Sequence, residues 1–306
     1  MPEGDSKWLR YLRMAVSLRG GTDVQGTIEG IRTNVALRGA NIWLLVCSSI
    51  LASIGLDLNS TAVIIGAMLI SPLMSPILGV GLGVAIMDRH LLKSSMGNLG
   101  RATFISLAVS SLYFSATPLG SLTEQLEART VPTLLDVGVA FFGGIAGIVA
   151  GSRKEKTSAI PGVAIATALM PPICTAGFGL ANWDSTVFLG AIYLYFINAF
   201  FIAMATYLIA LMLRFPKCAR PDEESESRLK WGMVAFAVLI TAPSAYIFYN
   251  VIQKAHFDRE VRNFVNNEIR RDERQPIRWD VLPGDTQPRI VGDGLYKTYV
   301  GATLTA

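Results

Sequence analysis

The sequence is short of charge and of cysteine, and each shortage excludes a class of protein. Only 16% of its 306 residues are charged, whereas 51% are hydrophobic, a balance that a soluble globular domain rarely shows. The three cysteines, Cys47, Cys174 and Cys218, stand far apart and indicate neither a disulfide framework nor a metal site. A signal peptide is not predicted, because the first long apolar run begins only near Ala40.

Motifs for chemistry inside a membrane are also missing. The sequence contains no His-Glu-x-x-His motif, no pair of acidic residues within an apolar run, and no serine and histidine together at membrane depth. We therefore expect no enzymatic activity, no cofactor and no bound metal. The basic residues stand beside apolar runs, where they report membrane orientation, so no nucleic-acid partner is expected.

Long apolar runs predict an all-α polytopic membrane protein in the lipid bilayer of the cell (inner) membrane. Seven spans are expected, at about residues 40–56, 60–87, 102–119, 133–150, 160–181, 186–213 and 231–252. Lys and Arg gather before the first span and after the second, fourth and sixth. In the loops after the first, third and fifth spans the single basic residue is Arg129. By the positive-inside rule, we expect a cytoplasmic N-terminus and an external C-terminus.

These spans divide the chain into five parts. We expect cytoplasmic amphipathic helices at 1–39, transmembrane repeats at 40–119 and 133–215, the seventh span at 229–254, and a small external α+β tail at 255–306. The tail has about fifty residues, which bury too little surface to be stable alone. It must dock on the membrane domain, pair with another subunit or belong to a longer domain.

Two serine–proline pairs, Ser71-Pro72 and Ser75-Pro76, interrupt the second span near its middle. Proline removes an amide donor, clashes with the carbonyl one turn back and pushes the preceding residue towards extended geometry. The pattern therefore predicts two half-helices joined by a short unwound piece. Lipid cannot satisfy the backbone groups that such a break frees, so the break must face protein or a water-filled cavity.

The same pattern returns about a hundred residues later. Residues 63–72 align without a gap on residues 163–172, and spaced glycines follow the prolines in both segments. The chain is therefore predicted to be duplicated, with three spans in each repeat. Because three is an odd number, the repeats must cross the membrane in opposite senses, as an inverted 3+3 transmembrane repeat. Its two broken helices would meet near the midplane.

The two breaks predict a binding site at mid-membrane. Its expected residues are Ser71, Pro72, Ser75, Pro76, Pro171, Pro172, Thr175 and Asn198, although a hydrogen bond between helices explains Asn198 equally well. If Pro72 or Pro76, and Pro172, each open a half-helix, then free amides point into the gap and favour anions or carboxylates. No acidic residue is predicted deep in either span, which argues against a divalent cation, whereas unwound carbonyls could hold sodium.

Three segments carry a family resemblance. They are residues 27–43, residues 52–60 and, above all, the run Ala62-Val-Ile-Ile-Gly-Ala-Met-Leu-Ile-Ser-Pro-Leu-Met-Ser-Pro76. With them the chain resembles the uncharacterised hydrophobic domain family of prokaryotes known as domain of unknown function 389, over about residues 23–215. The resemblance implies an integral membrane protein of bacterial or archaeal type. It implies no substrate or reaction.

Two functions remain open. The first is a membrane transporter or channel for a small solute, with an anion or a carboxylate as the preferred cargo, at the broken helices. The alternative is an oligomeric membrane scaffold or sensor without transport activity. An apolar seam of Val24, Ile28, Ile31 and Val35 fits either a subunit contact or a helix lying on its own bundle. Together with the glycine-rich span at 133–150, it leads us to expect a homo-oligomer.

Overall fold

The computed structural model of the protein describes residues 22–117, 121–153 and 160–218, and the four single residues Trp231, Ala242, Tyr246 and Tyr249. Of residues 160–168 it describes the backbone only. The start of the predicted N-terminal segment, almost all of the predicted seventh span and the whole α+β tail lie outside the described residues.

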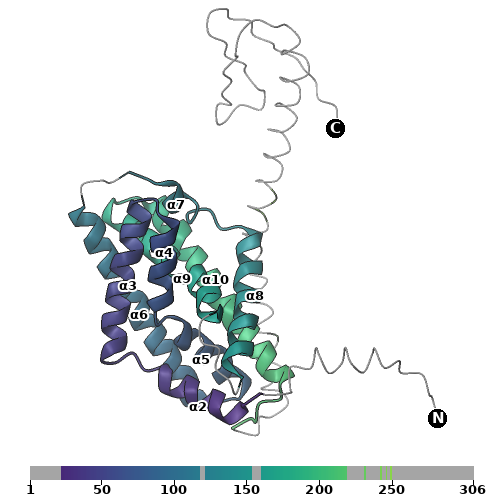
Figure 1. The fold of residues 1–306 in the computed structure, drawn as a ribbon. Coiled ribbons are helices and arrows are strands. Elements are labelled where there is room, and N and C mark those ends of the chain that lie inside the picture. Colours follow the sequence, from purple (N-terminus) through teal and green to yellow (C-terminus); the bar gives the residue numbers. More distant parts are fainter. Residues whose placement is uncertain are drawn as a thin grey trace, which may run out of the picture. The chain divides into compact units, whose positions relative to one another are not determined.

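The described part of the chain is all-helical (Figure 1). Its helices are α2 (Val24–Asn34), α3 (Ala40–Asp57), α4 (Thr61–Ile70), α5 (Met74–Ala85), α6 (Arg89–Ala116), α7 (Glu124–Glu127), α8 (Leu134–Gly151), α9 (Ile160–Ala181) and α10 (Ser185–Met212). Three of them, α3, α8 and α10, are long and apolar enough to cross a membrane, and α4 with α5 makes a fourth if the bent pair is one span. Several helices could therefore span a bilayer, as predicted.

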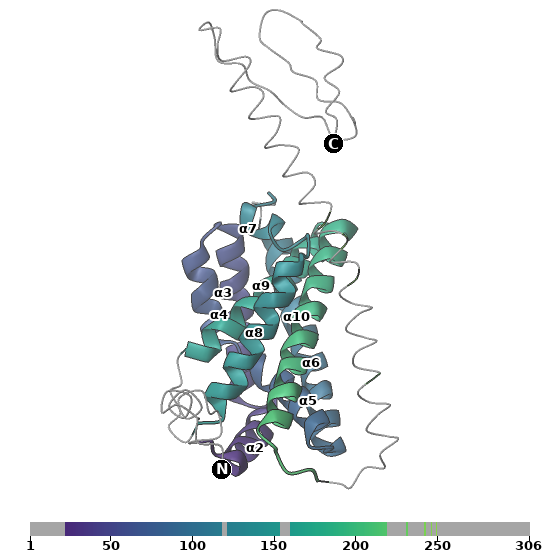
Figure 2. The same ribbon diagram turned by 90° about the vertical axis from the view of Figure 1, so that its right-hand side faces the viewer.

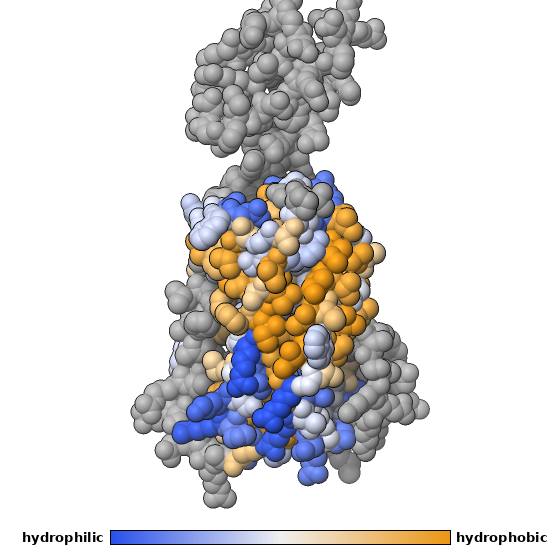
Figure 3. Space-filling view, turned by 90° about the vertical axis from the view of Figure 1, so that its left-hand side faces the viewer, coloured by the Kyte–Doolittle hydropathy of each residue, from blue (hydrophilic) through white to orange (hydrophobic). Residues whose placement is uncertain are grey.

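The surface of this part of the chain agrees with that composition. Figure 3 shows a broad apolar band on one face, with hydrophilic residues gathered below it. The third predicted span differs from the observed helix, because α6 begins at Arg89, well before residue 102. Asp88 explains the early start, since its carboxylate accepts a hydrogen bond from the amide of Leu91 (2.9 Å) and so caps the helix.

The helices place their connections at two opposite ends of the bundle, marked by α2 and α7 in both ribbon views (Figures 1 and 2). At the α2 end, the amide of Asp23 donates to the carbonyl of Ser152 after α8 (2.9 Å). The amide of Cys218, after α10, donates to the carbonyl of Ile86 after α5 (2.7 Å). At the α7 end, the Thr123 hydroxyl donates to the carbonyl of Leu56 near the end of α3 (2.7 Å). The Lys- and Arg-rich connections thus share one end.

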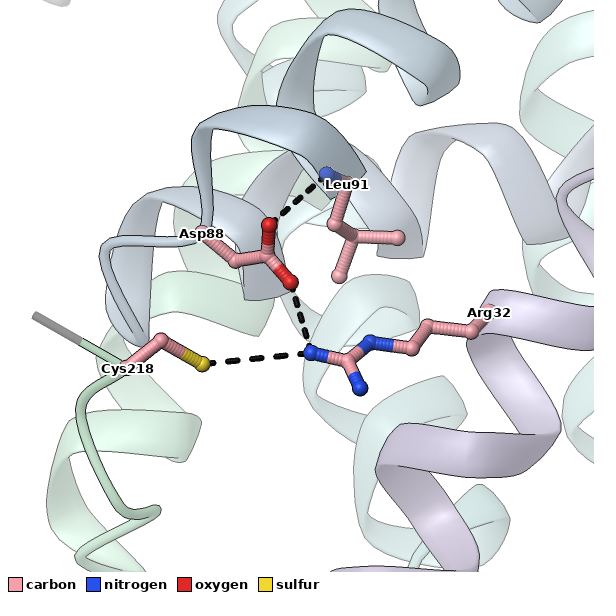
Figure 4. Close-up of polar contacts among 4 residues, drawn as sticks. All are labelled: Arg32, Asp88, Leu91 and Cys218. Atoms are coloured by element: carbon pink, nitrogen blue, oxygen red, sulfur yellow. Dashed lines mark hydrogen bonds and ion pairs between the residues drawn. The ribbon is translucent and has the colours of Figure 1, made fainter.

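An ion pair holds α2 to that end (Figure 4). A guanidinium nitrogen of Arg32 lies 2.7 Å from the Asp88 carboxylate and 3.8 Å from the Cys218 sulfur. Burial raises the pKa of Asp88, but hydrogen bonds from the Leu91 amide and from Arg32 outweigh burial and hold the pKa below its ordinary value. Because 43% of the Arg32 side chain is exposed, the pair contributes at most about 1 kcal/mol to stability.

The apolar seam of α2 faces its own bundle. Ile31 and Val35 are only 9% and 2% exposed, and Val24 and Ile28 pack partly buried against the same core. Of the two interpretations of the seam, packing within the chain is therefore the one observed. The glycines of α8 are used in the same way, because a Cβ on Gly144 would lie 2.9 Å from the Cα of Ile202 in α10.

The α5–α6 and α9–α10 turns have the same geometry. In the first, the amide of Asp88 donates to the carbonyl of Gly83 (2.9 Å), and in the second the amide of Asp184 donates to the carbonyl of Gly179 (2.9 Å). Each aspartate then caps the helix that follows. The residue before each aspartate is not glycine, yet it has a φ of 57°. Bulky residues rarely adopt this left-handed conformation, so the shared geometry is distinctive.

Helix packing across the bundle is reciprocal. Helix α5 packs against α10, where a Cβ on Gly81 would lie 2.2 Å from the carbonyl oxygen of Ala203 and 2.7 Å from Cβ of Thr206. Helix α9 packs against α6, where a Cβ on Gly177 would lie 2.6 Å from the Ser110 hydroxyl. Glycine is needed at both crossings because any side chain would separate the helices.

The predicted break in the second repeat is wrong. Helix α9 runs from Ile160 to Ala181 as one helix, with Pro171 and Pro172 inside it. It contacts α3, α4, α5, α6, α8 and α10, and all residues from Leu169 to Gly179 are buried. Tertiary packing on every side therefore holds the helix together, although the two prolines remove neighbouring amide donors.

The α5–α10 crossing gives a stability prediction. Gly81→Ala should lower the free energy of unfolding by about 1–3 kcal/mol, because the new Cβ meets a backbone carbonyl that cannot move aside. Gly66→Ala in α4 is the matched control, since no atom lies within 4 Å of its Cβ position, and it should stabilise by about 0.5–1 kcal/mol. Thermal unfolding in detergent compares them, and equal midpoints for both variants would contradict the close crossing.

Candidate functional site

The candidate site is the break between α4 and α5, where the two helices bend by 55°. Helix α4 ends at Ile70, and Ser71 is extended, with a ψ of 126°, as the residue before a proline must be. Helix α5 begins at Met74, and Leu73 before it provides no side-chain cap. The first amides of α5 therefore have no side-chain acceptor within the break. The predicted interruption of the second span is confirmed in this geometry.

The prolines at the break do not take the predicted position. Neither Pro72 nor Pro76 opens the second half-helix, because Met74 is its first residue and Pro76 its third. Proline is tolerated in a first turn, where its missing amide would have no helical partner in any case. Because Pro76 has no amide proton, the first turn of α5 has only the amides of Met74 and Ser75 as free donors.

The structure brings this break against the proline pair of α9. The Ser71 hydroxyl lies 3.9 Å from the sulfur of Met170, the residue before Pro171. On the α4–α5 side, Ser71, Pro72 and Ser75 are partly exposed, whereas Pro76 is buried. On the α9 side, Pro171 and Pro172 are both buried. The two proline segments therefore meet as predicted, but only one of them is open.

Helix α9 offers acceptors to this region. Because proline has no amide proton, Pro171 and Pro172 leave the carbonyl oxygens of residues 167 and 168 without their helical donors. At membrane depth such oxygens need another polar partner. The break thus has free amide donors, and the helix that it contacts at Met170 has two carbonyl oxygens without helical donors.

Two further predicted site residues are buried. Thr175 is fully buried on α9, and its hydroxyl has no hydrogen-bond partner. Asn198 is 4% exposed in the middle of α10, the helix that packs along both α5 and α9. No described hydrogen bond joins Thr175 to the break, and its place in the site stays a prediction.

The sequence interpretation missed a buried hydroxyl cluster that joins α3, α6 and α9. The hydroxyls of Ser53 and Ser110 are 2.9 Å apart, and Ser110 donates to the carbonyl of Cys174 (2.8 Å). The Cys174 thiol in turn lies 3.7 Å from the carbonyl of Ser49. Serines four residues apart within an apolar helix were the available signal, because this spacing puts them on one face. Such bonds join helices in a membrane.

Helix α6 carries two more buried hydroxyls. Ser95 and Ser106 are both fully buried, and neither hydroxyl has a hydrogen-bond partner. The buried face of α6 is therefore polar for much of its length, unlike that of α10. Among the described residues, no three His, Cys, Asp or Glu side chains are grouped so that they could hold a metal ion.

Comparison with known proteins finds a match to one protein family. Residues 68–204 match the family model described as "Domain of unknown function (DUF389)". The predicted family resemblance is confirmed. The matched DUF389 region contains the break, the α9 proline pair and Asn198.

One curated relative also matches part of the chain. An uncharacterised protein of Methanocaldococcus jannaschii is 25% identical over 187 residues. The match covers 61% of this chain and 58% of that relative, so the chain spans less than two thirds of the relative's length. No solved structure matches the chain.

The hydroxyl cluster gives a second prediction. Ser53→Ala and Ser110→Ala should each destabilise the protein, and the double variant should cost less than the sum, because both variants remove the same bond. The expected coupling is about 0.6 kcal/mol, typical of hydrogen bonds between helices in a membrane. A double-mutant cycle on unfolding in detergent measures it. Strictly additive costs would show that the two hydroxyls are not bonded.

Proposed function

We propose that this chain is an integral membrane transporter or channel for a small solute, with its site at the break between α4 and α5. The observation that carries the proposal is the break itself, because an apolar helix pair bends by 55° at three non-helical residues, of which Ser71 and Pro72 are partly exposed. Non-helical backbone at membrane depth is tolerated only against protein or in a water-filled cavity. Transporters use such interrupted helices to hold their cargo.

An inverted 3+3 repeat is part of this proposal. Equivalent positions in α5–α6 and α9–α10 recur at a separation of 96 residues, as for Gly83 and Gly179 or Asp88 and Asp184. The lengths also agree, since α3 and α8 have 18 residues each and α6 and α10 have 28 each. The reciprocal crossings support it further. Ser110 of the first repeat faces Gly177 of the second, and Thr206 of the second repeat faces Gly81 of the first. Both the two glycines and the two hydroxyl residues are again 96 residues apart. The two repeats differ in their second helix, which is broken only in the first.

The chemistry of the break favours a solute with both donors and acceptors. The amides of Met74 and Ser75 and the α5 helix dipole attract a negatively charged group. The carbonyl oxygens of residues 167 and 168 attract a donor or a cation. A small zwitterion, or a carboxylate that also carries a hydrogen-bond donor, can bind both the amides and the carbonyl oxygens. A simple anion can bind only the amides.

Transport gives a third prediction, tested by flux into proteoliposomes. The wild type should carry radiolabelled acetate, glycine or chloride above protein-free liposomes, and Ser75→Ala should reduce uptake about fivefold, as expected for one lost hydrogen bond worth about 1 kcal/mol. Gly66→Ala in α4 is the control with normal flux, because its Cβ meets no neighbour. Absence of flux for every probe, with folded protein in the liposomes, would count against transport.

We also propose a cytoplasmic α2 end and an external α7 end, on the strength of the Lys and Arg in the connections at the α2 end. In a Cys47→Ser background, native Cys218 at the α2 end should be protected from a membrane-impermeant maleimide added to intact cells. Trp183→Cys should react with the maleimide, because Trp183 lies in the α9–α10 turn and is 91% exposed. The reverse pattern would invert the proposed topology.

The alternative function, an oligomeric scaffold or sensor, has one observation in its favour. Pro171, Pro172 and Thr175 are fully buried, so half of the predicted site is packed as a core. A homo-oligomer stays a prediction. Of the two surfaces proposed for it, the α2 seam is covered within the chain, and so is Gly144 of α8, whereas no atom lies within 4 Å of a Cβ on Gly138. Flux separates the alternatives, since a scaffold carries no solute.

A further inference from the structure

Arg129 is the basic residue of the connection between α7 and α8, at the end of the bundle opposite α2 (Figure 1). Its turn is fixed in place. The amide of Arg129 donates to the carbonyl of Leu126 (3.0 Å), and Leu126 is fully buried. The next residue packs on α10, where a Cβ on Gly190 would lie 2.0 Å from the carbonyl oxygen of Thr130. The arginine is thus held by the fold and is not on a free loop.

The Arg129 side chain is half-buried, and no hydrogen bond or ion pair joins its guanidinium to another of the described residues. Its Nε is fully buried and makes no hydrogen bond. The acidic side chains of α7, Glu124 and Glu127, are exposed and form no ion pair with it. Burial lowers the pKa of Arg129, and the nearby charge of Asp136 offsets only part of this decrease.

Asp136 is already committed elsewhere. One of its carboxylate oxygens accepts hydrogen bonds from the amide (2.8 Å) and the hydroxyl (2.7 Å) of Thr133, in the capping box at the start of α8. One oxygen of this carboxylate therefore stabilises the helix N-terminus, and no described hydrogen bond or ion pair joins Asp136 to Arg129. The N-terminal dipole of α8 adds further positive potential four residues from Arg129.

A buried donor without a hydrogen-bond acceptor is costly, and the Nε of Arg129 is such a donor on a side chain whose fork is still open to solvent. The planar fork of a guanidinium matches the two oxygens of a carboxylate or phosphate. We propose that Arg129 binds an oxyanion, a carboxylate or phosphate group, at the α7 end of the bundle. This inference rests on the proposed function, in which the anionic group of a solute meets Arg129 before it reaches the break. A free solute and a lipid headgroup phosphate share the required chemistry.

The test is thermal unfolding of the full chain in lipid-free, non-ionic detergent. Sodium phosphate and sodium acetate are titrated against sodium chloride at matched ionic strength. For the wild type, phosphate or acetate at about a hundred times its Kd should raise Tm by about 5 °C relative to chloride. The rise should vanish in Arg129→Met and shrink in Arg129→Lys, which keeps the charge but not the fork. It should persist in Arg101→Gln, which removes an exposed arginine of α6.

Without oxyanion, Arg129→Met should unfold at the same Tm as the wild type or above it, because it removes a buried nitrogen that has no hydrogen-bond acceptor. A purely structural arginine would give the opposite result. The proposal is overturned if phosphate and acetate leave the wild-type Tm unchanged, if Arg129→Met keeps the full shift, or if it lowers Tm without any anion.

Nanodiscs identify the source of the anion. A wild-type Tm that rises with phosphatidylglycerol over phosphatidylcholine, but not in Arg129→Met, supports a lipid phosphate, whereas a rise only with soluble phosphate or acetate supports a free solute. Flux separates this inference from the proposed function. Flux by the wild type without any Tm shift overturns the Arg129 site alone. A shift that Arg129→Met abolishes, without wild-type flux, supports the site and overturns transport.

Discussion

The structure depends first on the rule that every backbone amide and carbonyl in a bilayer needs a partner. Proline breaks that rule wherever it enters an apolar helix, and this chain meets the problem in two ways. Between α4 and α5 the helix stops at Ser71, bends by 55° and restarts so that Pro76 falls in its first turn. In α9 the helix continues through Pro171 and Pro172, enclosed by its neighbours. One solution leaves a partly open site, and the other supplies carbonyl acceptors beside it.

Close packing makes the second solution workable. Glycines at Gly81 and Gly177 let α5 approach α10 and α9 approach α6 until side chain meets backbone. The cluster of Ser53, Ser110 and Cys174 adds polar bonds among α3, α6 and α9, where the hydrophobic effect cannot drive association because lipid is equally apolar. The helices around α9 thus form a rigid frame, and the α4–α5 break is the irregular element within it.

Local signals predicted much of this arrangement. The Ser71-Pro72 break, the apolar helices and the family were all read from residues next to one another in the chain. The break in α9 was wrong because burial on every side, which no local pattern reports, outweighs the lost amides. The predicted start of α5 was wrong because a first turn also tolerates proline at its third residue, where the missing amide has no helical partner. The buried Nε of Arg129 was missed, since the connection that carries it packs against α10, a contact between segments far apart in the sequence.

The central claim is that water reaches the α4–α5 break inside the bilayer. The most direct measurement uses a chain that lacks Cys47 and Cys218 and keeps only the fully buried native Cys174. One cysteine is added, either at Ser75 in the first turn of α5 beside the break or at Leu69, which is 53% exposed on α4. Both variants are reconstituted in liposomes and treated with a small charged thiol reagent. We expect Ser75→Cys to react and Leu69→Cys to stay protected, because charged reagents follow water and avoid lipid. Protection of Ser75→Cys, or equal reaction at both positions, would contradict the claim.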